Sequence, residues 1–236
     1  LSKDQQVDFA AQFGTISDRA TPKELLNETD PDYDGKIMLV TNLRDEKGNP
    51  VGTLPDGEMW FHHDQSYMPT PCKATLLHAI ELPSEGGNTK FANMYKAYEN
   101  VPEALKEKLC GGTVLQAYNR STVVRVDPED GLDGIAHQWQ PIFVKHAETG
   151  RPALYVSHLI SSQIDGMDRN ESEAVLEQLI AIAEDPALVY EHVWRDGDLV
   201  MWDNRCSTHA RTDFPPEETR LLRRCTLEGG PMIAAA

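Results

Sequence analysis

The sequence is short of cysteine, of basic residues and of long apolar runs. Four cysteines occur among 236 residues and none lies in a CxxC pair, which argues against a thiolate zinc site or a disulfide framework and favours a reducing cytoplasm. Lys and Arg total 22 against 38 Asp and Glu, and the net charge of −16 argues against nucleic acid as a partner. No apolar run approaches the roughly 20 residues that span a bilayer, so no membrane partner is expected.

The length and composition fit one large domain. Hydrophobic residues make up 40% of the chain and charged residues 25%, which is ordinary for a globular protein. A chain of this length buries most of the surface that it exposes when unfolded, so we predict a single domain over residues 1–236. The sequence begins with Leu1 rather than methionine, so a short native N-terminal segment is expected to be missing.

The order of the predicted elements favours a mainly β fold with inserted helices. Short apolar runs predict strands, and capping residues next to amphipathic stretches predict helices. Strands and helices do not alternate regularly, which argues against Rossmann and TIM architectures and favours a β-sandwich or jelly roll. The predicted strands lie within Lys36–Leu43, Ala74–Leu82, Arg195–Asn204 and Thr219–Gly229, and the predicted helices within Leu1–Gly14, Asn100–Gly112 and Arg169–Asp185.

The segment WFHHDQSY contains two adjacent histidines followed by an aspartate. In an extended chain, side chains two positions apart share a face, so His62 and Asp64 point the same way and His63 points to the other side. An imidazole and a carboxylate at this spacing can chelate one ion, although the same spacing is common by chance among structural and surface residues. A site with two histidines and one carboxylate also needs a second histidine elsewhere in the chain.

His209 stands out among the other histidines because a predicted buried strand precedes it and an arginine cluster follows it. If TRLLRRCT is a strand, Arg220 and Arg224 share one face with Leu222 and Thr226. Two inward arginines are costly to bury without anions, so the cluster favours an anion pocket; the alternative is a solvated basic strand. The arginines of the cluster are Arg205, Arg211, Arg220, Arg223 and Arg224.

Several segments together resemble the taurine dioxygenase/2,4-D dioxygenase (TauD/TfdA) family. They are WFHHDQSY, ELPSEGGNTKFANMYKAYENVP, HAETGRPALYV and WDNRCSTHARTDF with the later RLLRRCTLEG, and they occur in the family's order. The resemblance implies a double-stranded β-helix, which is a cupin-like jelly roll, and an oxygenase that uses Fe(II), 2-oxoglutarate and O₂. One departure is Phe61, because the family commonly places tryptophan immediately before the first metal ligand.

The resemblance also implies roles by position. Two histidines and one aspartate match the iron ligands, a threonine and an arginine match the residues that bind 2-oxoglutarate, and a second arginine matches one that meets the acidic group of the substrate. The iron ligands correspond to His62, Asp64 and His209. The residues that bind 2-oxoglutarate correspond to Thr89 and Arg220, and the one that meets the substrate corresponds to Arg224. His63 is not a ligand in this interpretation, because it breaks the HxD spacing.

The resulting hypothesis is an oxygenase that hydroxylates a small organic anion, such as a sulfonate, an aryloxyalkanoate or another carboxylate, and releases succinate and CO₂. Bond cleavage follows where the hydroxylated carbon bears oxygen, nitrogen or a sulfonate. The family also implies a homo-oligomer, a dimer or a tetramer. Two alternatives stay open: a metal-dependent hydrolase, which has no use for the pair Thr89 and Arg220, and a non-catalytic jelly-roll binding or sensor protein.

Overall fold

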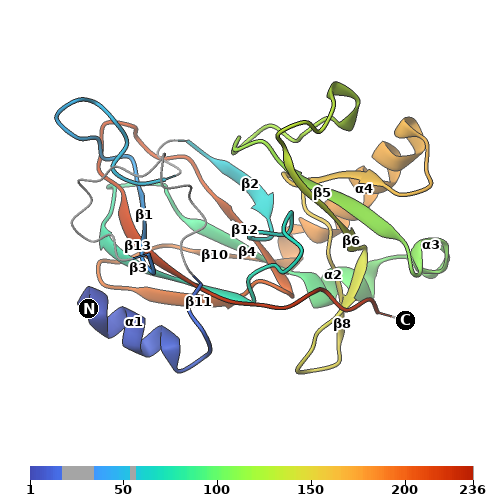
Figure 1. The fold of residues 1–236 in the computed structure, drawn as a ribbon, viewed down its shortest axis with the longest axis horizontal. Coiled ribbons are helices and arrows are strands. Elements are labelled where there is room, and N and C mark those ends of the chain that lie inside the picture. Colours follow the sequence, from blue (N-terminus) through green and yellow to red (C-terminus); the bar gives the residue numbers. More distant parts are fainter. Residues whose placement is uncertain (18–34, 54–56, 236) are drawn as a thin grey trace.

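Two four-stranded antiparallel sheets face each other and form one half of the protein (Figure 1). The structure is a computed structural model, and it describes residues 1–17, 35–53 and 57–235. The first sheet has the order β1-β13-β3-β11, and its strands are Met38–Thr41, Leu221–Leu227, Ala74–Glu81 and Leu199–Asp203. The second sheet has the order β10-β4-β12-β2, and its strands are Val189–His192, Thr89–Asn93, Ser207–Arg211 and Met59–His62.

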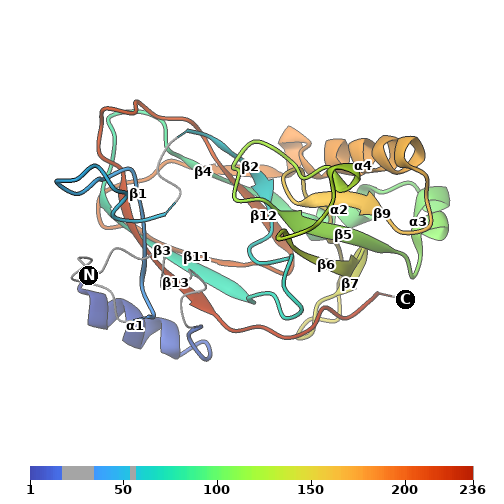
Figure 2. The same ribbon diagram turned by 45° about the horizontal axis from the view of Figure 1, so that its top comes forward.

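A second group of elements lies beside these two sheets (Figure 2). A three-stranded sheet has the order β6-β5-β9, and β7 pairs with β8. The strands are β5 Thr113–Tyr118, β6 Ala136–Pro141, β7 Phe143–Lys145, β8 Pro152–Leu154 and β9 Ser161–Ile164. The helices are α1 Lys3–Ala11, α2 Met94–Asn100, α3 Glu103–Leu109 and α4 Arg169–Ala183, and 3-10 turns occur at Pro128–Asp130 and Pro186–Leu188. None of the helices in the described ranges is long and apolar enough to cross a membrane.

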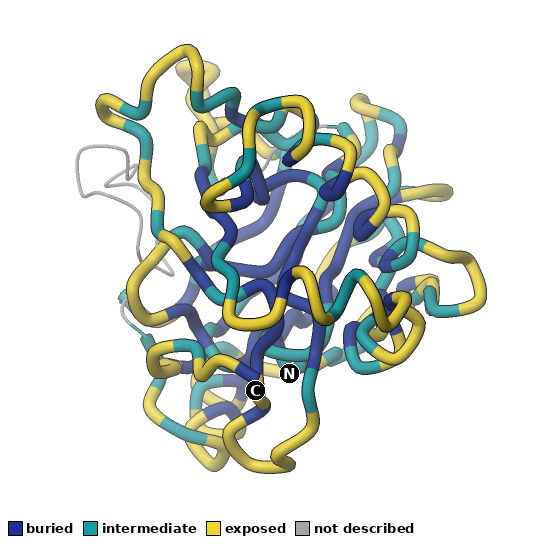
Figure 3. The backbone as a smooth tube through the Cα atoms, turned by 90° about the vertical axis from the view of Figure 1, so that its right-hand side faces the viewer, coloured by how far each residue is buried: buried dark blue, intermediate teal, exposed yellow. Residues whose placement is uncertain are grey.

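Strand β13 shows how the first sheet is buried on both faces. Leu222 packs with Val40 and Leu77 between the two sheets, whereas Cys225 and Leu227 pack in the cluster beneath α1. Side chains alternate between the faces of a strand, so the residues two and four positions after Leu222 also point between the sheets. Figure 3 shows buried backbone running through the centre of the molecule. Polar residues on this inner face are therefore withdrawn from solvent.

Local sequence signals predicted several elements correctly. Helix α1 begins after Ser2, whose hydroxyl accepts from the Gln5 backbone N–H while the Gln5 side chain accepts from the Ser2 N–H. This reciprocal capping box satisfies two donors at the start of the helix. The predicted helix at Arg169 is α4, and its apolar stripe is buried. The mainly β prediction with inserted helices is confirmed, and two facing antiparallel sheets are the arrangement of a jelly roll.

Candidate metal and anion site

Three metal-ligating side chains converge between the two sheets. His62 ends β2 and His209 lies in the neighbouring β12, and the antiparallel register places the two residues opposite each other. Asp64 follows in the turn after β2, and its Oδ1 lies 3.7 Å from His62 Nε2 and 3.8 Å from His209 Nε2. All three side chains are buried, and their ligating atoms lie within 4.8 Å of one another.

The protonation states of this group suit a cation. His62 Nδ1 lies 2.9 Å from the Trp60 carbonyl oxygen, so Nδ1 donates there and Nε2 is the nitrogen that faces the other two residues. Burial, followed by repulsion from His62, holds the pKa of His209 well below its usual range. Burial alone would raise the pKa of Asp64, but the charge of Arg224, with a further effect of His209, holds this pKa well below its usual range. The site therefore presents the Nε2 atom of His62, a neutral His209 imidazole and a carboxylate.

This donor set fits Fe(II). Two histidines and one carboxylate on one side of the ion are the ligands of non-haem iron oxygenases, and metal binding needs all three groups deprotonated. The observed separations of 3.7 and 3.8 Å exceed the ~3 Å between adjacent ligands that lie about 2.1 Å from one ion.

Hydrogen bonds hold Asp64 at both its backbone and its carboxylate. The Asn204 side chain accepts from the Asp64 backbone N–H at 2.7 Å and donates to the Asp64 carbonyl at 2.7 Å. The carboxylate oxygen Oδ2 accepts from Thr75 Oγ1 at 2.8 Å and from Arg224 Nη2 at 2.7 Å. With Oδ2 occupied in this way, Oδ1 is the oxygen that faces the two histidines.

Other histidines near the site are engaged elsewhere. His63 is fully buried against Tyr155, with ring centroids 4.2 Å apart, and burial lowers its pKa to about 3. His146 belongs to a second group with metal-ligand spacing, but its Nε2 donates to Asp203 at 3.0 Å and its Nδ1 accepts from backbone N–H groups. The Asp203 carboxylate is also paired with Arg205, so the donors of this second group are already used within the protein.

A pocket between the sheets joins the histidines to the two predicted inward arginines. Arg220 is 2% exposed and its Nε donates to the Gly87 carbonyl at 3.0 Å, but within the described part of the chain its guanidinium has no carboxylate partner. Burial, followed by the charge of Arg211, lowers the pKa of Arg220 to about 9, so the group is still charged at neutral pH. A buried charge of this kind is stabilised by an anion. The pocket is lined by Val40, Met59, His62, Leu77, Thr89, Trp202, His209, Ala210, Arg211, Arg220 and Arg224.

The GGNT turn brings Thr89 beside Arg220. Gly87 has a φ of +63°, and a Cβ at this position would lie 2.8 Å from Arg220 Nε, so glycine allows the guanidinium to approach the backbone. Thr89 begins β4, is buried, and lines the same pocket. Its Oγ1 accepts from the indole Nε1 of Trp194 at 3.0 Å. Because a hydroxyl has one proton, this contact leaves the Thr89 proton available to a ligand.

Arg224 lines the pocket and also contacts a metal-ligating residue. The sequence predicted only a substrate contact for it. Its Nη2 donates to Asp64 Oδ2 and its Nε donates to Thr226 Oγ1 at 3.2 Å. Its Nη1 has no hydrogen-bond partner among the residues that the structure describes. The guanidinium therefore retains donors for an anion while it is bound to Asp64.

Three buried residues of this site were not predicted from the sequence. Thr75 and Trp194 lie in segments whose pattern indicates only buried structure, so nothing local distinguishes them. Asn204 lies in the turn directly after β11, and a polar residue next to a buried strand is a signal that its amide has specific partners. All three are at most 8% exposed.

The sequence is similar to a known family of dioxygenases. The sequence model of the family described as "Taurine catabolism dioxygenase TauD, TfdA family" matches residues 1–226. Pentalenolactone F synthase of Streptomyces avermitilis is 34% identical over 244 aligned residues, covering 94% of this chain and 76% of that protein. An alpha-ketoglutarate-dependent 2,4-dichlorophenoxyacetate dioxygenase of Burkholderia sp. is 32% identical over 243 residues, covering 97% of this chain and 79% of that protein.

Solved structures share the fold. A taurine dioxygenase from Burkholderia xenovorans superimposes with a TM-score of 0.75 at 25% identity, covering 99% of this chain and 75% of that one. AAD-2 in complex with Mn(II) and N-oxalylglycine superimposes with a TM-score of 0.73 at 26% identity, covering 99% and 81%. The jelly-roll prediction is confirmed by these similarities.

Proposed function

The chain belongs to the TauD/TfdA family and is a 2-oxoglutarate-dependent dioxygenase that uses Fe(II) and O₂, and from this premise we propose that it hydroxylates a small organic anion bound by Arg224. The observation that carries the proposal is the inner pocket, which combines a metal-ligating triad with two buried arginines. A metal-dependent hydrolase has no use for a pair of residues, Thr89 and Arg220, that binds a dicarboxylate. The co-products are succinate and CO₂.

Each group of residues has one task in this proposal. His62, Asp64 and His209 hold the iron, and Arg220 and Thr89 bind the distal carboxylate of 2-oxoglutarate, where the guanidinium lacks a carboxylate partner among the described residues. When bound, the iron and 2-oxoglutarate supply, with O₂, the oxidising power that converts a substrate C–H into C–OH. The protein orients the reacting C–H bond in a pocket that is lined by residues of both sheets.

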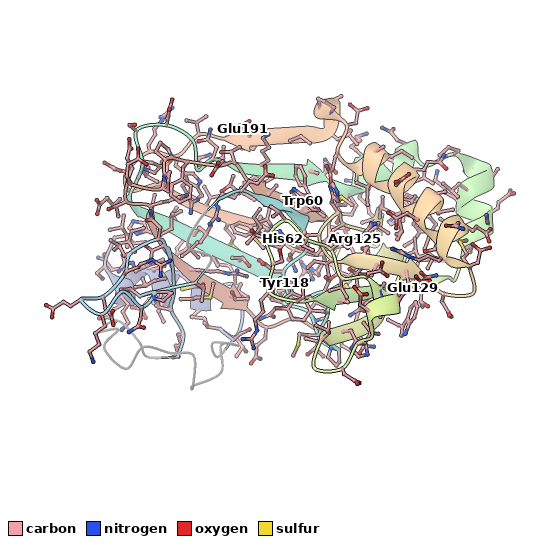
Figure 4. The ribbon with its side chains drawn as sticks, turned by 90° about the horizontal axis from the view of Figure 1, so that it is seen from above. Trp60, His62, Tyr118, Arg125, Glu129 and Glu191 are labelled. Atoms are coloured by element: carbon pink, nitrogen blue, oxygen red, sulfur yellow. The ribbon has the colours of Figure 1, made fainter. Side chains whose placement is uncertain are left out.

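The substrate is an anion with an apolar part. Arg224 offers donors to its acidic group. Tyr67 and Tyr118 stack with ring centroids 5.0 Å apart and pack in one apolar cluster with Trp60, in the region of His62 (Figure 4). A flat apolar group packs well on such rings. Aryloxyalkanoates, on which one relative acts, and other apolar carboxylates are therefore the first substrates to test, followed by sulfonates. Where the hydroxylated carbon bears oxygen, nitrogen or a sulfonate, the product breaks down with bond cleavage.

The test is succinate release from a panel of organic anions with Fe(II), 2-oxoglutarate and O₂. A true substrate stimulates 2-oxoglutarate turnover above the level without substrate, and the hydroxylated product is identified by mass spectrometry. Arg224→Ala is expected to raise the substrate KM, and unchanged substrate kinetics in this variant would contradict its role. If the folded protein, kept anaerobic with Fe(II) and 2-oxoglutarate, shows no charge-transfer absorption, the oxygenase assignment of this site fails.

We further propose that residues 1–236 form one catalytic domain and that the protein is a cytoplasmic homo-oligomer, a dimer or a tetramer. Limited proteolysis tests the domain, because a single domain gives no stable smaller core. Light scattering coupled to gel filtration measures the oligomeric state directly, and fractionation of the source cells measures the location.

A further inference from the structure

The Asp64 carboxylate is held by an asymmetric set of contacts. Oδ1 faces the two histidines at 3.7 and 3.8 Å, whereas Oδ2 accepts two short hydrogen bonds, from Thr75 Oγ1 and Arg224 Nη2. Two donors on one oxygen fix the rotation of the carboxylate about its last bond. The same contacts leave the lone pairs of Oδ1 free for a cation.

We propose that Thr75 is a positioning residue that keeps Asp64 Oδ1 directed at His62 and His209, an inference that rests on the proposed metal-binding role of this triad. Thr75 is fully buried in β3, between Trp202 of β11 and Thr226 of β13, so neighbouring strands on both sides fix its backbone. Its hydroxyl does not line the pocket. Its position is therefore independent of what the pocket contains.

The direction of the Thr75 hydrogen bond follows from its neighbours. Arg224 Nη2 lies 3.5 Å from Thr75 Oγ1 and is only a donor, so it points a proton at the hydroxyl oxygen. The Thr75 proton is then directed to Asp64 Oδ2, at 2.8 Å. A carboxylate that accepts a hydrogen bond keeps its negative charge and its orientation, which are the two properties that a metal ligand needs.

Thr75 and Arg224 are not equivalent partners of Asp64. Arg224 lines the pocket and is the proposed contact for the acidic group of the substrate, so its guanidinium is shared when substrate arrives. Thr75 does not line the pocket, so it holds Oδ2 in both situations. Thr75 therefore acts on the metal ligand alone, whereas Arg224 contacts both the metal ligand and the substrate.

The experiment compares metal affinity in matched threonine variants. Thr75→Val removes the hydroxyl and keeps the shape of the side chain, and Thr75→Ser keeps the hydroxyl. Thr208→Val is the control, because Thr208 is also buried, in β12 next to His209, and among the described residues its hydroxyl hydrogen-bonds only to Met94 Sδ, at 3.6 Å. The dissociation constant of Mn(II) is measured by calorimetry without 2-oxoglutarate, and the Co(II) d–d absorption spectrum reports the ligand geometry.

Loss of an outer partner of a metal ligand typically costs 10- to 100-fold in metal affinity. We expect that loss, with a changed Co(II) spectrum, in Thr75→Val, and values within about threefold of wild type in Thr75→Ser and Thr208→Val. Thermal unfolding of the metal-free variants checks the fold, and Thr75→Ala replaces Thr75→Val if valine does not fold.

Three results overturn the proposal. If Thr75→Val keeps the wild-type Mn(II) affinity and Co(II) spectrum, the proposed role of Thr75 is wrong, although the metal site stands. The same conclusion follows if Thr208→Val loses as much Mn(II) affinity as Thr75→Val. If the wild-type protein itself binds neither ion, the proposed metal site fails, and the role of Thr75 fails with it.

Discussion

Replacing Arg220 with methionine separates the stability of the protein from its affinity for 2-oxoglutarate. Methionine keeps an unbranched apolar stem and removes the charge. Burial, with a smaller effect of Arg211, lowers the pKa of Arg220 from 12.5 to about 9. At about 1.4 kcal/mol for each pKa unit, burying this charge without an anion costs the folded protein on the order of 5 kcal/mol.

The variant is therefore expected to behave differently with and without ligand. Without 2-oxoglutarate, its midpoint of thermal unfolding should equal or exceed that of wild type, because the uncompensated charge is gone. Removing one partner of a buried ion pair costs about 2–5 kcal/mol, and the lower limit corresponds to a ~30-fold weaker complex. We expect the dissociation constant of 2-oxoglutarate to rise at least ~30-fold.

Calorimetric titration of Mn(II)-loaded protein with 2-oxoglutarate measures this constant without turnover. Arg223→Met is the matched control, because Arg223 is the same residue type three positions further along the chain, is also buried, and contacts His78 and the Leu1 carbonyl instead of the pocket. An affinity of Arg220→Met within threefold of wild type, or an equal loss in Arg223→Met, would refute the assignment of Arg220.

Three further predictions follow from contacts in the same site. Asp64→Ala and His209→Ala should each abolish the charge-transfer absorption of the anaerobic Fe(II) and 2-oxoglutarate complex, and a retained band in either variant contradicts the triad. Trp194→Phe should raise the 2-oxoglutarate dissociation constant about fivefold, the equivalent of one hydrogen bond of about 1 kcal/mol. In a protein that already carries Thr89→Val, the same change should raise this constant no further. If the two losses of affinity add, Trp194 does not act through Thr89. Asn204→Ala should lower the free energy of unfolding by about 2–4 kcal/mol in urea titrations, because the buried backbone groups of Asp64 lose their hydrogen-bond partners. A loss below about 0.5 kcal/mol would contradict the stabilising role of the Asn204 hydrogen bonds to Asp64.

The sequence determined those features that depend on residue type and short spacing. Capping residues and apolar periodicity located α1 and α4, and the two-residue period of an extended chain separated His62 and Asp64 from His63. The short strands β5 to β9 and helix α2 did not stand out, because three to seven residues carry too little periodicity. Their positions depend on packing against one another, which no local pattern records.

The tertiary structure decided which distant residues meet. The register of β2 and β12 sets His209 opposite His62, and the facing of the two sheets brings Arg224 of β13, and Arg220 directly before that strand, to these histidines. The sequence indicated that two arginines share a face, but it did not show that one lacks a carboxylate partner among the described residues while the other is bound to Asp64. Strand period is a local property of the chain, whereas these contacts depend on strand register and sheet packing, which hydrophobic burial over the whole core fixes.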